Sequence, residues 1–102
     1  MSFAWEKFHG AMYMIANTGS IQKRLADAYI YHLKHIHDDA LPPEIKDDFK
    51  KLRVDLTSVK PAGTEDPVVT AVEAMSEAKA YENIMKIIRM YNILAKDETP
   101  LP

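Results

Sequence analysis

The sequence contains no cysteine and only three glycines among its 102 residues. Without cysteine the chain can form neither disulfide bonds nor thiolate metal clusters, so its folding does not depend on an oxidising compartment. It has no glycine-rich phosphate loop and no apolar run near the ~20 residues that a membrane-spanning helix needs. The opening segment lacks a basic leader, so we expect a helix there and not a secretion signal. These absences predict a cytoplasmic protein that does not enter a membrane.

The sequence also lacks an excess of charge of one sign. Thirteen Lys and Arg residues against fifteen Asp and Glu residues give a net charge of −2. A protein held on nucleic acid mainly by its electrostatic field needs a basic surface, and the most charged segment, KDDFKKLR, mixes both signs. We therefore expect no nucleic-acid partner, and a nucleic-acid-binding helical domain is only the third of our hypotheses.

Apolar residues recur at the spacing of helical turns in the first half of the chain. Ser2 is a candidate N-cap of a helix that ends before the turn NTGS, where Gly19 suits a left-handed conformation. Ser20 can cap a second helix, predicted over residues 21–37. The expected inward faces are Trp5, Phe8, Met12 and Ile15 on the first helix, and Ile21, Leu25, Ala28, Tyr29 and Ile36 on the second.

The second half contains one clear loop between helical patterns. Pro43 suits the first turn of a third helix, and the segment KPAGTEDP, residues 60–67, predicts the loop. Asp66 and Pro67 predict the cap and first position of a short helix through about residue 74, and Ser76 is a candidate cap for the last long helix. The expected inward faces are Ile45, Phe49, Leu52, Leu56 and Val59 on the third helix, and Tyr81, Ile84, Ile87, Ile88, Tyr91 and Ala95 on the last.

These patterns predict an all-α fold. A chain of this length suits one domain with one core, and no alternating segment predicts paired strands. We expect a single-domain bundle of four main helices with a short extra helix before the last. The bundle domain is assigned to residues 1–97, and residues 98–102 are expected to form a frayed C-terminal tail.

The segment AYIYHLKHIHDD, residues 28–39, is the most chemically suggestive stretch. On a continuous helix His32 lies at the centre of the apolar stripe, His35 at its rim, and His37 on the other side. The favoured interpretation is a partly buried core histidine with a hydrogen-bond partner. The alternative is a small metal-binding or acid–base site centred on His32 and His35, with Asp or Glu from a neighbouring helix. A pH-sensitive contact is a further alternative.

Several apolar residues fall outside the predicted inward faces. The last helix carries them on a second side, and a helix that is apolar on two sides is often buried on two sides. Methionine suits adaptable contacts. We therefore predict that this helix takes part in self-association or partner binding; in the alternative, it is central and the other three helices cover its second face. The candidate protein-contact residues are Ile30, Tyr31, Met85, Met90 and Ile93.

Three segments of the sequence together resemble a known class of proteins. They are SFAWEKFHGAMYMIANTGSIQKRLADAY, LPPEIKDDFKKLRVDLTSV and AMSEAKAYENIMKIIRMYNILA. This combination is similar to a class of short bacterial all-helical proteins with no established activity. The resemblance implies a bacterial or phage context and an all-helical fold, and it implies no functional residues.

The sequence thus predicts a small non-enzymatic protein that acts through protein–protein interaction with a partner or with itself. A regulator, an antitoxin-like protein and a phage-encoded inhibitor all fit this description. No cofactor, catalytic residue or small-molecule ligand is expected. Burial of apolar side chains at a helix face would provide the affinity, with polar contacts at the rim.

Overall fold

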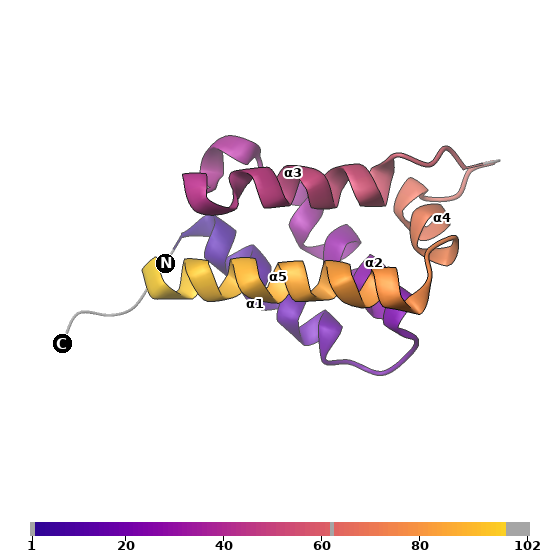
Figure 1. Ribbon diagram of the computed structural model, residues 1–102, viewed down its shortest axis with the longest axis horizontal. Coiled ribbons are helices and arrows are strands. Elements are labelled where there is room, and N and C mark those ends of the chain that lie inside the picture. The colour runs from indigo at the N-terminus through magenta and orange to yellow at the C-terminus, as the bar shows by residue number, and fades with distance from the viewer. Residues whose placement is uncertain (1, 62, 98–102) are drawn as a thin grey trace.

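Helices form almost the whole of the computed structural model, which describes residues 2–61 and 63–97 (Figure 1). This part of the chain contains α1 (Phe3–Ile15), α2 (Ile21–Tyr31), α3 (Pro43–Thr57), α4 (Pro67–Glu73) and α5 (Glu77–Asp97), with two 3-10 turns, η1 (Leu33–His35) and η2 (Asp38–Ala40), and no strand. The predicted all-α fold, with a short extra helix before the last, is confirmed. The predicted tail, 98–102, lies outside the described residues.

The residues predicted to start helices do so. The side-chain oxygens of Ser2, Ser20, Asp66 and Ser76 each accept a hydrogen bond from a main-chain N–H two or three residues further on, at 2.8 to 3.1 Å. Each bond satisfies a donor that the first turn of a helix leaves without a partner. Because this chemistry is local, it could be recognised from the sequence alone.

The second helix is shorter than predicted. It ends at Tyr31 and not at residue 37, because His32 leaves the helical conformation with φ −131° and ψ −61°. The chain continues through η1 and η2, which bury the side chains of Leu33 and Ile36. The Arg53 guanidinium of α3 donates to the Ile36 carbonyl oxygen at 3.5 Å. Contacts with other helices therefore outweigh the helical pattern of this segment.

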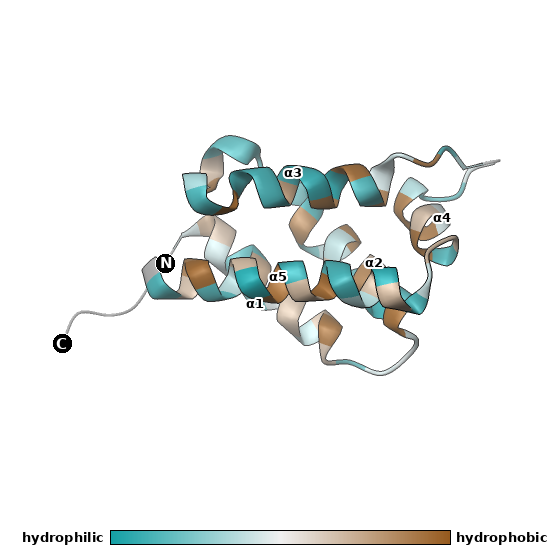
Figure 2. Cartoon of the chain, in the orientation of Figure 1, coloured by the Kyte–Doolittle hydropathy of each residue, from teal (hydrophilic) through white to brown (hydrophobic). Residues whose placement is uncertain are grey.

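The helices form two layers around one core (Figure 1). Helices α3 and α5 run side by side in opposite directions, α1 and α2 lie behind them, and α4 closes one end. Helix α5 contacts α1, α2 and α3. Apolar residues gather on the sides of the helices that face one another (Figure 2). The largest fully buried side chains are Phe8, Leu25, Leu33, Ile45, Phe49, Leu52, Leu56, Asn83, Ile87 and Met90.

Two predicted inward faces need correction. Val59 lies beyond the end of α3 and is 39% exposed, and Tyr81 on α5 is 56% exposed. Met90, predicted to lie on the surface, is fully buried. Because α5 packs against α1, α2 and α3, its inward face is displaced around the helix from the predicted one. That face consists of Ala80, Asn83, Ile84, Ile87, Met90 and Leu94.

No helix among the described residues combines the length and the hydropathy needed to cross a bilayer.

Candidate functional site

His32 packs against the backbone of α1. Its Nδ1 atom lies only 2.5 Å from the position that a Cβ atom would occupy at Gly10, so the glycine makes room for the imidazole ring. Burial lowers the pKa of His32 below its usual value, and the positive charges of Lys7 and His35 lower it further. The predicted partial burial is confirmed. No described residue makes the hydrogen bond that was expected for the His32 ring.

The histidines do not come together as one metal site. Among the described residues, no group of three or more His, Asp and Glu side chains is placed to hold a metal ion. His35 and His37 are both exposed. Asp38, the nearest acidic residue in sequence, is bonded to Arg53 at 2.7 Å. The His32 and His35 pair therefore has no third ligand in this part of the chain.

The Arg53 side chain holds η2 against α3. It donates to the Asp38 carboxylate, and this bond lowers the pKa of Asp38 below its usual range. Its guanidinium also lies 5.1 Å from the centre of the Phe49 ring. Burial raises the pKa of Tyr29, and the neighbouring Arg53 guanidinium lowers it in part. These contacts hold the segment that follows α2 against α3.

A different histidine, His9, lies at the centre of an aromatic cluster that we did not predict from the sequence. Its ring stacks on Trp5 with the ring centres 4.6 Å apart and meets the Tyr13 ring edge-on at 5.3 Å. Its Nδ1 atom is 2.9 Å from the Tyr91 hydroxyl on α5. Trp5, His9 and Tyr13 are four residues apart in WEKFHGAMY, and this spacing on one edge of α1 was the signal available in the sequence.

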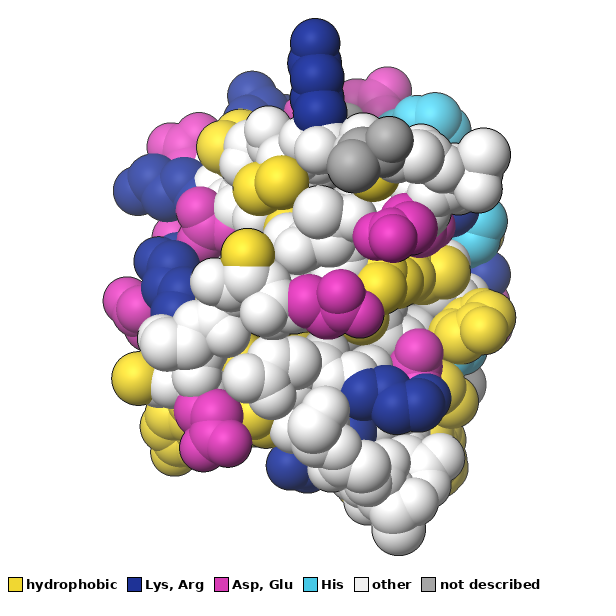
Figure 3. All heavy atoms as spheres, turned by 90° about the vertical axis from the view of Figure 1, so that its right-hand side faces the viewer, with side chains coloured by type: hydrophobic (Ala, Val, Ile, Leu, Met, Phe, Trp, Pro, Cys, Tyr) yellow, Lys and Arg dark blue, Asp and Glu magenta, His cyan; other side chains and the backbone are white. Residues whose placement is uncertain are grey.

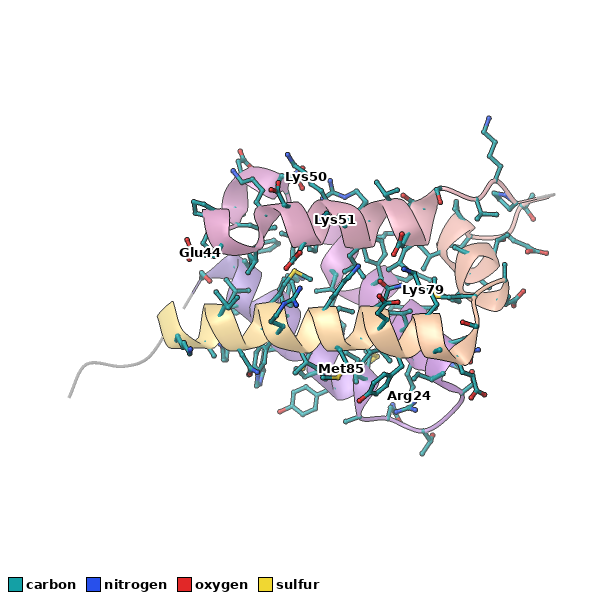
Figure 4. All side chains as sticks on the ribbon, in the orientation of Figure 1. Arg24, Glu44, Lys50, Lys51, Lys79 and Met85 are labelled. Carbon is teal, nitrogen blue, oxygen red and sulfur yellow. The ribbon has the colours of Figure 1, made fainter. Side chains whose placement is uncertain are left out.

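The cluster lies along the line where α1 and α5 meet. In Figure 1, α1 crosses behind α5, so the last turn of α1, which carries Tyr13, emerges along the edge of α5 away from α3. Tyr13, Tyr81 and Met85 are 65%, 56% and 44% exposed. Figure 4 shows Met85 on the edge of α5 away from α3. We call this area the seam surface; it consists of Trp5, His9, Tyr13, Tyr81, Met85, Ile88 and Tyr91.

Two of the other exposed apolar residues, Phe3 and Val54, stand beside charged groups. The Lys7 ammonium lies 5.3 Å from the centre of the Phe3 ring. Val54 lies with Lys50, Lys51 and Asp55 in a shallow groove of about 240 Å³ along α3. Phe3 and Val54 therefore each have basic side chains as neighbours.

The five residues predicted to contact a partner differ in their exposure. Tyr31 and Met85 are exposed, and Ile30 and Ile93 are partly buried against the core. The prediction that Met90 lies on the surface is wrong, because its side chain is fully buried in the core. The contact role of the other four stays a prediction, and of these four only Met85 belongs to the seam surface.

The flank between α3 and α5 is held by ion pairs. Asp48 and Arg89 are 2.7 Å apart, and Asp55 and Lys79 are 3.5 Å apart. At the end of the molecule that carries α4, acidic and basic side chains are interspersed (Figure 3). On these two areas the opposite charges offset one another, and neither presents a basic stripe to nucleic acid.

The described part of the chain is thus an all-α protein of five helices, with an uncharged aromatic surface between its first and last helices. Comparison with family models, with curated proteins and with solved structures finds no match to this chain. The resemblance to short bacterial helical proteins therefore stays a prediction.

Proposed function

We propose that this is a non-enzymatic cytoplasmic protein that acts by binding another protein chain through its seam surface. The observation that carries the proposal is the gathering of large, uncharged side chains there. Tyr13, Tyr81 and Met85 are 65%, 56% and 44% exposed, and the Tyr13 ring meets the His9 ring edge-on. A contiguous apolar area of this kind on a folded protein is typical of an interaction site.

The composition of the seam surface supports the same function. Trp, Tyr and Met are enriched at the centres of protein interfaces, where charged residues are depleted. Tyr13, Tyr81 and Met85 are the most exposed members and would supply the main contact area. The bond between His9 and Tyr91 holds the underlying helices together, so little order would have to be gained on binding.

This way of acting suits a regulator, an antitoxin-like protein or a phage-encoded inhibitor, and the proposal covers all three. In each case the protein would change its partner's activity by covering a surface or holding a conformation. No covalent step and no cofactor is needed for that.

The proposal can be tested by quantitative affinity capture from a native lysate with matched variants. Met85→Glu places a charge on the seam surface, and Val54→Glu makes the same kind of change at an exposed residue on α3, 61% exposed. We expect captured proteins that are retained by the wild-type chain and Val54→Glu but lost with Met85→Glu. Circular dichroism would confirm that both variants are folded. An identical set of captured proteins from all three chains would contradict the proposal.

A further inference from the structure

Helix α5 carries a second stripe of uncharged residues in addition to its inward face. The residues follow one another at spacings of three, four, three, four and three: Ala78, Tyr81, Met85, Ile88, Asn92 and Ala95. This is the heptad spacing of a helix that packs along another helix. The stripe spans about 26 Å at 1.5 Å per residue. Ala78, Tyr81, Met85 and Asn92 are exposed, and Ile88 and Ala95 are partly buried.

We propose that the partner at the seam surface is a second copy of this chain, whose α5 packs antiparallel along the same stripe. This inference rests on the proposed protein-binding function and names its partner. A two-fold axis at the middle of the stripe brings the same surface of both copies together. The stripe is evenly placed about that axis, so each of its residues meets another stripe residue of the second copy.

The pairs that result are chemically matched. Met85 lies opposite Ile88 of the second copy, and Ala78 lies opposite Ala95. Tyr81 lies opposite Asn92, so a phenol hydroxyl meets a side-chain amide, and the symmetry forms this pair twice. A polar residue in a heptad stripe sets the register of two helices, because only one register gives it a hydrogen-bond partner.

The charges beside the stripe favour the antiparallel direction. Glu82, Arg89 and Lys96 follow the edge of the stripe nearer α3, where Arg89 also pairs with Asp48, and the acidic residue is nearest the start of α5. Antiparallel packing about the same axis places Glu82 opposite residue 91 of the second copy, two residues from the exposed Arg89. Parallel packing would instead place Glu82 beside Glu77 of the second copy, and like charges at such positions destabilise the pair.

The size of the contact indicates a reversible dimer. One helix face about 26 Å long and roughly 10 Å wide, with Tyr13 of α1 at its border, is smaller than the roughly 800 Å² per partner of a standard interface. We therefore expect the mass measured by light scattering to rise from monomer towards dimer over about 1 µM to 1 mM. Met85→Glu and Asn92→Lys should stay monomeric, whereas Val54→Glu should associate like the wild-type chain.

The absence of cysteine makes the orientation directly measurable by cross-linking. A mixture of Ala78→Cys and Ala95→Cys chains, one of them tagged for size, should form a mixed disulfide dimer under mild oxidation. Asn92→Cys alone should not form a disulfide dimer, because position 92 lies opposite position 92 of the second copy only in a parallel pair. Val54→Cys, which lies outside the stripe, measures the amount of cross-linking that random collision produces. Cross-linking of Asn92→Cys above the mixture, or of neither above Val54→Cys, would overturn the antiparallel dimer.

The two proposals fail in different ways. A wild-type chain that stays monomeric to about 1 mM, while Met85→Glu still loses a captured protein, would remove the second copy as partner and leave the proposed function standing. If neither the mass nor the captured proteins respond to Met85→Glu, both proposals are wrong.

Discussion

Gly10 on α1 is the position where a single methyl group should have the clearest effect. A Cβ atom there would lie 2.5 Å from Nδ1 and 2.6 Å from Cε1 of His32. Non-bonded carbon atoms are in contact at about 3.5 Å or more, so the added methyl overlaps the ring by about 1 Å. The imidazole must leave its place, or α1 must move away from the end of α2.

The sign of the effect follows from two opposing contributions. Replacing a helical glycine by alanine stabilises a helix by about 1 kcal/mol. Overpacking a close contact costs about 1–3 kcal/mol. Gly10→Ala should therefore lower the free energy of unfolding by up to about 2 kcal/mol, or about 4–8 °C in Tm for each kcal/mol. When His32 is replaced by alanine, the overlap disappears, and the same substitution should stabilise the protein by about 1 kcal/mol.

The assay is urea unfolding of four chains: wild type, Gly10→Ala, His32→Ala and the double variant. The coupling between the two substitutions should be about 1–3 kcal/mol, since the residues are in direct contact. The reasoning is refuted if Gly10→Ala stabilises both backgrounds equally, because the ring would then not lie against α1.

Three further outcomes follow from the structure. Tyr91→Phe removes the bond to His9 and should cost about 1 kcal/mol in urea unfolding, whereas Tyr13→Phe on the exposed edge should change stability by less than about 0.5 kcal/mol; equal losses would contradict the bond. Because the pKa of His32 is lower in the folded state than in the unfolded chain, the unfolded chain binds more protons on acidification. The free energy of unfolding should therefore fall as the pH drops below about 6.5. His32→Gln should reduce that fall, and unchanged pH dependence would argue against the burial of the ring. Asn83 is fully buried, and no described residue bonds to its Oδ1 atom, so Asn83→Leu should leave thermal stability equal or raised by about 1 kcal/mol; a loss above about 2 kcal/mol would show that the oxygen has a partner.

Local chemistry made much of the fold predictable. The four side-chain caps, Pro43 and the break between the third and fourth helices are set within a few residues, and the described residues confirm each of them. The inward face of α3 was also read correctly over Ile45 to Leu56, because charged residues flank it on both sides. The candidate site was less predictable. Met85 was identified from its place off the predicted core face, whereas His9 and Tyr91 are 82 positions apart and their bond has no local signal.

The sequence by itself determined that the chain is all-α, where most helices begin, and that no thiol chemistry is available. The tertiary structure alone decided where α2 ends, that Met90 turns inward, and that His9 and not His32 lies at the centre of the aromatic surface. The reason is that a helix pattern records which residues are apolar, while the choice between two apolar sides depends on which neighbours pack there. α5 packs against α1, α2 and α3, and only the positions of these helices leave Tyr81 and Met85 exposed.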